Sequence, residues 1–308
     1  MKQTVLITGG TGLVGKALTG ELVKKGYKVI ILTRNVNGKE RLDSVMYAEW
    51  NVQKQEININ ALQLADYIIH LAGAGVVEKK WTTAYKKEIQ ESRTESSRLI
   101  IDALKNNVNK IKAIISASAI GWYGADAELV KPFTEADAAD DSFLGQTCKL
   151  WEASIEPVTA LGKRLVKLRT GIVLSNEGGA LAEFKKPLRF GIAAVLGNGK
   201  QIVSWIHIND LCKLFIAGIE NENLSGSYNA VAPNPVSNKT LTLTLAKAMK
   251  GKFFIPMRVP EFILKMMMGQ RSIEILKSTT VSCKKILATG FEFSFNNIET
   301  ALQDLVKK

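Results

Sequence analysis

The first half of the chain alternates short β-branched, apolar runs with longer stretches whose apolar residues recur at helical spacing. Strands that alternate with helices are typical of crossover units that build a parallel sheet. Because such crossovers are right-handed, the pattern predicts an α/β fold with a doubly wound parallel sheet, whose ligand crevice lies at the carboxyl ends of the strands. We expect strands at 4–7, 28–32, 45–50, 66–71, 113–116 and 165–168, and helices near 14–25, 81–106 and 142–161.

The second half of the chain contains shorter elements separated by glycine and proline turns, as at Gly178-Gly179 and Pro233 to Pro235. After about residue 237 we expect a helix at 240–250, a strand at 253–259, a methionine-rich helix at 261–268 and a closing helix at 296–306. The pattern therefore predicts a sheet domain over 1–236, with 176–204 contributing to a cap on the substrate side. A smaller C-terminal α+β substrate-side subdomain should follow over 237–308.

The net charge of +12 raises the question of a nucleic-acid partner. The lysines are scattered along the 308 residues, without a run of five and without interleaved aromatics. We therefore expect no nucleic-acid partner. A basic surface that attracts small anionic substrates and cofactors explains the charge.

Three cysteines, Cys148, Cys212 and Cys283, lie far apart and never form a CxxC pair. This spacing argues against both a disulfide framework and a zinc site, so we expect no metal and a reducing cytoplasmic location. The apolar run at 5–7 is too short for a signal peptide, and no stretch approaches the roughly 20 apolar residues of a membrane span. We therefore expect no membrane insertion; the sequence makes no prediction of oligomeric state.

A glycine-rich loop follows the first predicted strand and directly precedes a helix. Gly9 allows a tight turn, Gly12 allows backbone amides to approach a diphosphate, and Gly15 allows close packing of helix and strand. The unpaired N–H groups at the helix start favour the negative charge of that diphosphate. An ordinary strand-to-helix turn is the alternative, but the context is that of a dinucleotide-binding Rossmann domain. The expected cofactor contacts in this loop are Thr8, Gly9, Gly12, Leu13, Val14 and Gly15.

The end of the second strand distinguishes the two nicotinamide dinucleotides. A site specific for NAD would carry an acidic residue there, whereas this chain has Arg34, with Lys39 and Arg41 nearby. A guanidinium can pair bidentately with a 2′-phosphate, so we predict NADP (NADPH) as the cofactor. A solvated loop cation is the alternative. Asn51, beyond the third strand, is a candidate contact for the adenine.

The nicotinamide half of the cofactor should lie over the strands that follow. Small residues after the fourth strand, and residues at the ends of the fifth and sixth, suit a close backbone approach to ribose and phosphates. His70 is better explained as a strand-end histidine with a satisfied hydrogen bond than as a catalyst. The further cofactor candidates are Leu71, Ala72, Gly73, Ser116, Thr170, Gly171 and Ile172.

Together these motifs resemble the extended short-chain dehydrogenase/reductase superfamily, which includes sugar-nucleotide epimerases and dehydratases. The resemblance rests on TGxxGxxG at 8–15 and on the serine-rich turn from Ser116 to the Tyr123-Gly124 pair. More narrowly, the segment from Trp205 to Asp210 and the ending from Pro260 through Phe291 are similar to an atypical epimerase-like family. That family carries a short C-terminal domain of unknown function and is sometimes labelled as cell-division inhibitor homologues.

The resemblance implies a catalytic serine, tyrosine and lysine, of which this chain matches one. Ser118 matches the serine that orients the substrate oxygen. If the predicted helix at 142–161 is aligned on Glu152, the tyrosine and lysine positions hold Leu144 and Cys148. A shift of one residue, to use Lys149, leaves glycine at the tyrosine position and rotates the lysine by about 100° around the helix. Neither register restores the pair.

Three interpretations follow from the missing pair. Cys148 or Tyr123 replaces the tyrosine as acid/base, the chemistry needs no strong acid, or the protein binds NADP(H) without turnover as a redox-responsive regulator. A small buried hydrophobe is the alternative role for Cys148, and a packing aromatic is the alternative for Tyr123.

On the substrate side, Trp122 and His207 are the candidates, with a packed, hydrogen-bonded core histidine as the alternative for His207. Asp210 should cap the helix that begins near residue 211. Arg169, at the end of a buried strand, should pair with a carboxylate. We therefore expect an NADP(H)-binding, epimerase-like oxidoreductase acting on a small hydroxyl- or carbonyl-bearing substrate. Its alternative is a catalytically silent regulatory protein.

Overall fold

The computed structural model describes residues 2–39, 43–127 and 131–307. Within these ranges the central feature is an eight-stranded sheet in the order β13-β7-β6-β5-β1-β2-β3-β4. Every neighbouring pair in it is parallel except β3 and β4. Its strands are β1 (Thr4–Thr8), β2 (Lys28–Thr33), β3 (Val45–Asn51), β4 (Glu56–Ile57), β5 (Tyr67–His70), β6 (Ala113–Ala119), β7 (Arg164–Thr170) and β13 (Gly226–Ala230).

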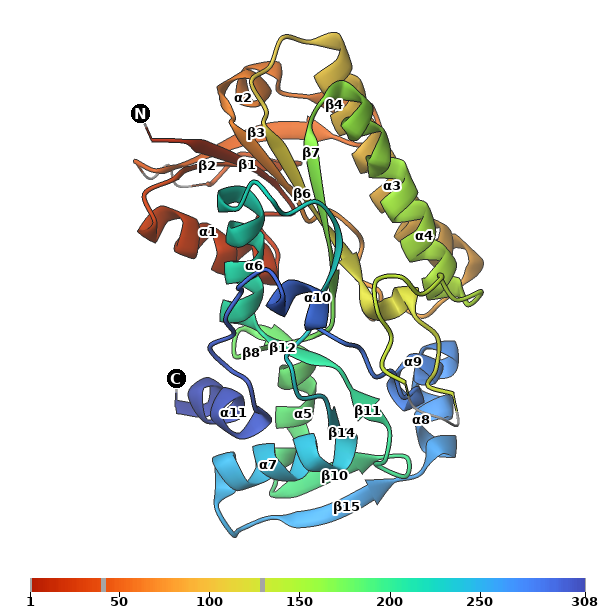
Figure 1. The fold of residues 1–308 in the computed structure, drawn as a ribbon. Coiled ribbons are helices and arrows are strands. Elements are labelled where there is room, and N and C mark those ends of the chain that lie inside the picture. Colours follow the sequence, from red (N-terminus) through yellow and green to blue (C-terminus); the bar gives the residue numbers. More distant parts are fainter. Residues whose placement is uncertain (1, 40–42, 128–130, 308) are drawn as a thin grey trace.

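Helices cover both faces of this sheet (Figure 1). Alternate residues of a strand point to opposite faces, so Val5 and Ile7 of β1 join one apolar core while Leu6 joins the other. The first core includes Leu18 of α1, and the second includes Ile100 of α3. The predicted doubly wound α/β fold is therefore confirmed. The helices are α1 (Leu13–Lys24), α2 (Ile59–Leu64), α3 (Thr83–Asn106), α4 (Phe143–Ile155) and α6 (Ile208–Glu220), with short 3-10 turns η1 (Ile120–Trp122) and η2 (Glu156–Leu161).

Two strands of the large sheet were not expected from the pattern. β4 has two residues, and β13 has the sequence GSYNA, whose small and polar residues lack a β-branched run. β13 is held by its pairing with β7, from Gly226 opposite Val166 to Ala230 opposite Thr170. The predicted helix at 142–161 also divides into α4 and η2, and Pro157 lies in the first turn of η2.

A smaller lobe contains short sheets and the remaining helices (Figure 1). β10 pairs in parallel with β15, from Ile192 opposite Ile255 to Leu196 opposite Val259. The segment predicted as a cap and the segment predicted as the C-terminal subdomain therefore share this lobe, and the boundary at 236 stays a prediction. Apart from α10 (Lys284–Leu287), which packs against β13 of the large sheet, its elements are β8 (Ile172–Ser175), β9 (Gly178–Gly179), α5 (Ala180–Leu188), β10 (Ile192–Leu196), β11 (Ile202–Val203), β12 (Trp205–His207), β14 (Val236–Ser237), α7 (Asn238–Lys250), β15 (Ile255–Val259), α8 (Glu261–Met268), η3 (Gly269–Arg271), α9 (Ser272–Leu276) and α11 (Ile298–Lys307).

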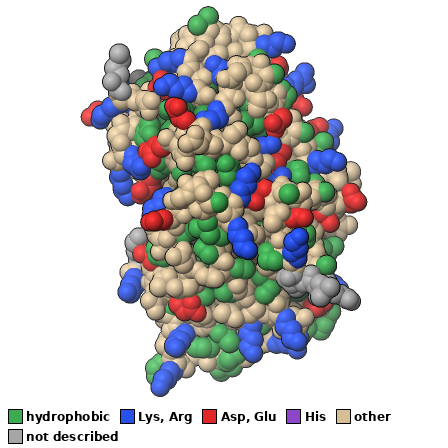
Figure 2. Space-filling view, in the orientation of Figure 1, with side chains coloured by type: hydrophobic (Ala, Val, Ile, Leu, Met, Phe, Trp, Pro, Cys, Tyr) green, Lys and Arg blue, Asp and Glu red, His purple; other side chains and the backbone are tan. Residues whose placement is uncertain are grey.

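The surface carries the excess positive charge in a dispersed form. Figure 2 shows lysine and arginine side chains distributed over the visible face, among acidic and apolar ones. None of the helices in the described ranges combines the length and apolarity that crossing a bilayer requires.

Candidate active site

The glycine turn between β1 and α1 has little room for side chains. Gly9 has φ +69°, and a Cβ there would lie 2.9 Å from the carbonyl carbon of Leu71. A Cβ on Gly15 would lie 2.5 Å from the Cα of Gly10. A Cβ on Gly12 would approach only the Gly9 carbonyl oxygen, at 3.3 Å, and Gly12 is exposed. Gly9 and Gly15 therefore permit the turn and the close packing of α1, while Gly12 leaves the backbone open to an incoming group.

The first turn of α1 lacks a capping side chain. Its N-cap is Gly12, whereas Thr82 and Ser142 cap α3 and α4 through their hydroxyl groups. Among the residues that the structure describes, no acceptor is bonded to the N–H groups of Leu13 and Val14. These groups lie at the positive end of the helix dipole, which favours an anion. The turn thus fits the diphosphate of a dinucleotide without a change of backbone.

Thr8 and His70 link the first strand to the loop after β5. The buried Thr8 hydroxyl lies 2.8 Å from His70 Nδ1 and accepts hydrogen bonds from the N–H groups of Leu71 and Ala72, at 3.1 and 3.2 Å. Burial, and next the Arg93 cation, lower the pKa of His70 to about 3, so its ring is neutral. Thr8 therefore shapes the loop through internal hydrogen bonds. The contacts of His70 agree with the expected strand-end histidine.

The adenosine side of the site carries the predicted cation. Arg34 follows β2, is exposed, and makes no ion pair within the described part of the chain. Lys39 is exposed, with its Nζ 6.0 Å from the ring centre of Tyr47, and Arg41 lies outside the described residues. Asn51 ends β3, and its side-chain oxygen accepts a hydrogen bond from the N–H of Lys54 at 3.1 Å. The Arg34 guanidinium is thus accessible to solvent at the end of β2.

The serine-rich turn begins inside β6. Ser116 is buried and donates to the Ala117 carbonyl at 3.1 Å. Ser118, with 3% of its surface exposed, lies opposite Arg169 of β7 in the sheet register. Its hydroxyl donates to Oε1 of Glu152, on α4, at 2.7 Å. The Ser118 oxygen therefore keeps its lone pairs for a second partner, while its proton is committed to the carboxylate.

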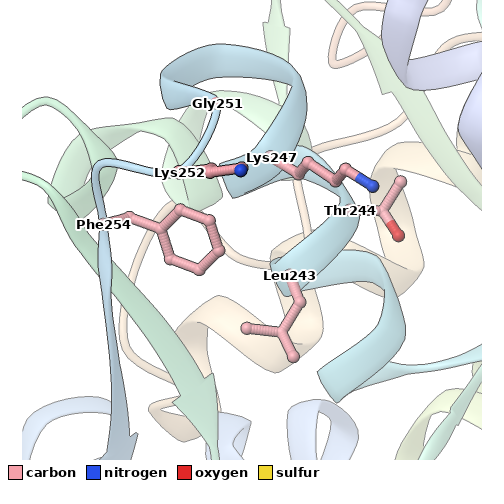
Figure 3. A pocket seen from close by; sticks show the side chains of 6 residues that line it. All are labelled: Leu243, Thr244, Lys247, Gly251, Lys252 and Phe254. Atoms are coloured by element: carbon pink, nitrogen blue, oxygen red, sulfur yellow. The ribbon is translucent and has the colours of Figure 1, made fainter.

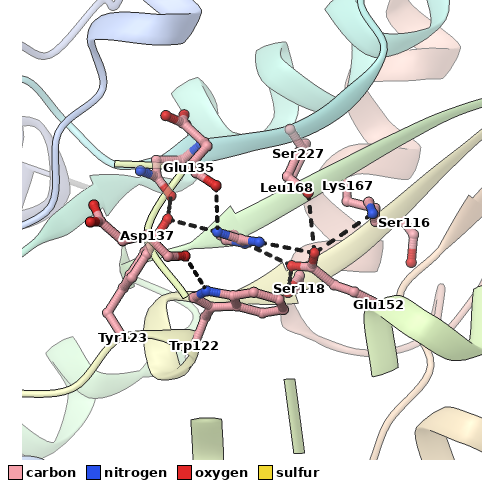
Figure 4. A network of polar contacts seen from close by, with 12 residues as sticks. Ser116, Ser118, Trp122, Tyr123, Glu135, Asp137, Glu152, Lys167, Leu168 and Ser227 are labelled. Carbon is pink, nitrogen blue, oxygen red and sulfur yellow. Dashed lines mark hydrogen bonds and ion pairs between the residues drawn. The ribbon is translucent and has the colours of Figure 1, made fainter. Parts of the chain in front are cut away.

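Glu152 is the centre of a buried polar network (Figure 4). Arg169 pairs with it bidentately, Nε to Oε1 at 2.8 Å and Nη2 to Oε2 at 3.1 Å. Ser227 donates to Oε2 at 3.1 Å, and Lys167 Nζ lies 3.7 Å from the same oxygen. Burial acts to raise the pKa of Glu152, but the hydrogen bonds from Arg169 and Ser118 outweigh it and hold the pKa below its usual value. The expected carboxylate partner of Arg169 is confirmed.

Two aromatic residues of the turn after β6 flank the Arg169 guanidinium. Its Cζ lies 3.6 Å from the ring centre of Trp122, which is partly exposed and donates from Nε1 to the Asp137 carbonyl. Tyr123 is 1% exposed, donates to Oδ1 of Asn229 at 2.7 Å and accepts from Arg169 at 3.0 Å. Burial raises the pKa of Tyr123 to about 12. These contacts favour the packing role of Tyr123. Of the two aromatic residues, Trp122 is the one that solvent can reach.

The contacts of Gly121 show which residues of α4 face the turn after β6, where the resemblance implies a tyrosine and a lysine. A Cβ on Gly121 would lie 3.3 Å from Cβ of Leu144 and 3.6 Å from Sγ of Cys148, so these two residues face the turn. Gly145 faces away, because a Cβ there would lie 2.1 Å from the Asp140 carbonyl oxygen. The two residues that the alignment on Glu152 gives, Leu144 and Cys148, therefore both lie against the turn after β6. Burial raises the pKa of Cys148 to about 12, which favours a packed thiol over an acid/base.

The end of β7 continues directly into the smaller lobe. Thr170 donates to the Leu168 carbonyl at 3.1 Å, and Ile172 is 39% exposed. A Cβ on Gly171 would lie 2.5 Å from the Ser204 carbonyl oxygen. Gly171 is therefore needed where β8 passes close to the segment before β12.

His207 lies in the apolar core. It is 1% exposed, stacks on Phe295 with ring centres 3.8 Å apart, and its Nδ1 accepts from the N–H of Asn209. This arrangement favours the core alternative for His207 over a substrate contact. His207 is also the N-cap of α6, so the expectation that Asp210 caps this helix is wrong. The buried Asp210 carboxylate instead accepts from the N–H groups of Ser294 and Phe295.

Sequence reasoning missed Arg93, which lies beside the loop after β5, at Gly73 and Ala74, and is 9% exposed. The detectable sign was a cation four residues after Ile89 on the apolar stripe of the predicted helix, where a buried side chain is expected. A surface pocket of about 430 Å³ was also not anticipated (Figure 3). It is lined by Leu243, Thr244, Lys247, Gly251, Lys252 and Phe254, none of which is a site candidate.

Comparisons with known proteins agree with this geometry. The NAD dependent epimerase/dehydratase family model matches residues 5–148, and the domain of unknown function DUF1731 matches residues 259–305. An epimerase family protein of Staphylococcus aureus (strain NCTC 8325) is 38% identical over 312 residues, covering 100% of both chains. The epimerase family protein YfhF of Bacillus subtilis (strain 168) is 35% identical, covering 99% of this chain and 98% of that one.

Solved structures agree as well. Human epimerase family protein SDR39U1 (isoform 2), in a crystal structure with NADPH, superposes with a TM-score of 0.85 at 27% identity and covers 99% of each chain. UDP-glucose 4-epimerase from Thermotoga maritima shares the fold, with a TM-score of 0.80 at 19% identity, covering 99% of this chain and 98% of that one. The expected resemblance is confirmed: the chain belongs to the NAD dependent epimerase/dehydratase family, with a C-terminal DUF1731 domain.

Proposed function

We propose that this protein binds NADP(H) and transfers a hydride between the nicotinamide and a small hydroxyl- or carbonyl-bearing substrate. The observation that carries the proposal is the uncapped start of α1, where glycine backbone and free N–H groups form a diphosphate site. Arg34 at the end of β2 supports NADP(H) over NAD(H), because its guanidinium is exposed and free to pair with a 2′-phosphate. The NADPH in the human relative's structure agrees with this choice.

Three groups of residues in this chain would each hold a different part of the cofactor. The amides of Leu13 and Val14 would hold the diphosphate, Arg34 the 2′-phosphate, and the loop from Leu71 to Gly73 the ribose and phosphates on the nicotinamide side. When bound, the nicotinamide ring supplies the hydride acceptor or donor. The carboxyl ends of β5, β1 and β2 are neighbours in the sheet, which supports a cofactor lying across them with its adenosine at β2, its diphosphate at β1 and its nicotinamide at β5.

On the substrate side, Ser118 would accept a hydrogen bond from a substrate hydroxyl. Its own proton is donated to Glu152, which Arg169 keeps ionised, so its free lone pairs suit an alcohol better than a carbonyl. The partly exposed Trp122 ring, fixed on Arg169, would form one wall beside it. This arrangement supports a hydroxyl-bearing ligand without identifying its skeleton.

Oxidation of that hydroxyl sends its hydride to the nicotinamide and releases a proton, which would pass to solvent water at the partly exposed Trp122 side. Reduction of a carbonyl would take its proton from the same water. Cys148 and Tyr123 both have pKa values near 12, and the pKa of His70 is about 3. A group that shuttles protons at neutral pH needs a pKa near 7. These values support the second interpretation of the missing pair, a chemistry that needs no strong acid from the protein.

Titration with the four nicotinamide dinucleotides tests the cofactor assignment. We expect saturable binding with NADPH preferred over NADH. Arg34→Ala should weaken NADPH binding by about 10- to 100-fold, as expected for a lost charge-assisted hydrogen bond, and leave NADH unchanged. Arg98→Ala, which removes an exposed arginine of α3, is the matched control.

NADPH oxidation with a panel of carbonyl compounds, and NADP⁺ reduction with the corresponding alcohols, tests the hydride transfer. Turnover with any member supports the proposal. Tight cofactor binding with no turnover across both panels would instead support the regulatory alternative. A clear preference for NADH would refute the role of Arg34, and no saturable binding of any dinucleotide would refute the whole assignment.

A further inference from the structure

Arg93 is a buried cation that has no ion-pair partner among the residues the structure describes. It lies in the middle of α3 and is 9% exposed. No carboxylate in the described ranges forms an ion pair with it, in contrast to Arg169, which pairs with Glu152. Burying an uncompensated charge is costly, and such charges are usually paired or bound to a ligand. Arg93 therefore has the character of a binding residue.

Among the described residues, hydrogen-bond acceptors meet one edge of the Arg93 guanidinium. Nη1 donates to the carbonyl oxygens of Ala74 and Ile89, at 3.0 and 2.8 Å. Cζ lies 4.8 Å from the ring centre of Trp151, on α4, so the planar group is held between the loop and the indole. For Nε and Nη2, the described part of the chain offers no bonded acceptor. Arg93 thus keeps donors for an oxygen-bearing ligand, in an orientation fixed by stacking.

The guanidinium lies directly against the cofactor loop. A Cβ on Gly73 would lie 2.9 Å from Cζ and 3.2 Å from Nε of Arg93, so only glycine leaves room there, and Gly73 itself is exposed. The charge also reaches Cys148, whose pKa it acts to lower against the larger effect of burial. Cys148 in turn faces Gly121, in the turn after β6. Arg93 is therefore located between the carboxyl ends of β5 and β6.

This location determines which half of a dinucleotide Arg93 can reach. In the sheet order, β5 and β6 lie on one side of β1, and β2 with Arg34 lies on the other. A dinucleotide whose diphosphate sits at the start of α1 and whose adenosine extends over β2 has its nicotinamide half over β5 and β6. The step rests on the proposed function, because it assumes that a dinucleotide binds in this orientation.

We propose that Arg93 is a cofactor ligand that makes the protein prefer the reduced dinucleotide. Its open edge donates to oxygen atoms on the nicotinamide side, and its charge favours the neutral ring of NADPH over the positively charged ring of NADP⁺. At an effective dielectric constant of about 20, a cation disfavours a second cation about tenfold even across roughly 10 Å. The expected preference for NADPH over NADP⁺ is therefore on the order of tenfold.

The test measures dissociation constants for NADPH and NADP⁺, by fluorescence and calorimetry, without any substrate. In the wild type we expect NADPH to bind about tenfold more tightly. Arg93→Met keeps the apolar stem and removes the charge, so its two constants should become nearly equal while that for NADPH rises. Arg93→Lys should keep the preference. The matched control is Arg98→Met on the same helix, where the exposed arginine pairs with Glu95 and Asp102, and its ratio should equal that of the wild type.

The outcomes separate this inference from the proposed function. If wild-type protein binds both forms and shows no preference, Arg93 is not the proposed ligand, although the cofactor assignment stands. An unchanged ratio in Arg93→Met would also overturn the inference, because a purely structural arginine would alter stability and not the ratio. If Arg93→Met does not fold, the inference is judged from the ratio of the NADPH and NADP⁺ dissociation constants in the wild type and in Arg93→Lys. Failure of the wild type to bind either form overturns both proposals.

Discussion

Replacing Glu152 by Gln removes one charge from the buried network while keeping the shape of the side chain. In the wild type the carboxylate accepts hydrogen bonds from Arg169, Ser118 and Ser227. The amide of Gln has one oxygen instead of two, and Arg169, which is 3% exposed, retains its charge. The variant therefore contains a buried guanidinium without its counter-charge.

The expected cost follows from this loss. Removing one partner of a buried ion pair destabilises a protein by about 3–5 kcal/mol. Unfolding entropies average about 2.1 cal/mol/K per residue, so for 308 residues this corresponds to a fall in Tm of about 5–8 °C. The measurement is thermal unfolding followed by circular dichroism at pH 7.

The difference in stability between the wild type and Glu152→Gln should also depend on pH. The folded pKa of Glu152 lies below its usual value of 4.5 because hydrogen bonds from Arg169 and Ser118 outweigh burial. A lowered pKa stabilises the folded state above the unfolded pKa, and this stabilisation is lost as the pH falls through the folded pKa. The Tm difference between wild type and Glu152→Gln should therefore be full at pH 7 and should shrink below about pH 4.

Glu183→Gln is the matched control, because Glu183 is exposed and pairs with Lys186 three residues along α5. Loss of this exposed ion pair should lower the free energy of unfolding by less than about 1 kcal/mol. A Glu152→Gln variant that melts within about 1 °C of the wild type at pH 7 would refute the reasoning. So would a Tm difference that stays as large well below about pH 4 as it is at pH 7, since the carboxylate charge would then contribute nothing.

Three further substitutions test the rest of the site. Gly15→Ala introduces a Cβ 2.5 Å from the Gly10 Cα, so it should lower the free energy of unfolding by about 1–3 kcal/mol and abolish NADPH binding in a titration. The control is Gly20→Ala on the same helix, where a Cβ would have nothing within 4 Å, and it should have neither effect. Cys148→Ala should leave the pH profile of any turnover unchanged, and a shifted profile would restore the thiol, whose pKa is about 12, as an acid/base candidate. Tyr123→Phe removes a buried hydroxyl bonded to Asn229 and Arg169, so urea unfolding should show a loss of about 1–2 kcal/mol, and an unchanged midpoint would contradict the scaffolding role.

The glycine turn between β1 and α1 was predictable because its geometry is local in sequence. A strand, three spaced glycines and a helix specify this turn within eight residues, and the position of Arg34 follows from the end of the next strand. In the structure, a Cβ added at Gly9 or Gly15 would clash with nearby backbone atoms, so both positions need the glycine that the pattern places there. The strands β4 and β13 were missed because their pairing with neighbours, and not their own composition, makes them strands.

The substrate side was less predictable because its residues are distant in sequence. A carboxylate was expected beside Arg169, yet nothing in the spacing identified Glu152, which approaches from α4 across the end of β6. His207 was equally compatible with a pocket and a core, and the approach of Phe295, 88 positions further along the chain, favours the core.

The sequence by itself determined the fold class and the dinucleotide turn, because hydrophobic period and glycine spacing act within single elements. Only the tertiary structure decided which buried cation is neutralised. Arg93 and Arg169 are both buried, but α4 brings Glu152 to Arg169 and brings an indole to Arg93. Electrostatic energy depends on distance in space, and that distance exists only once the helices pack on the sheet.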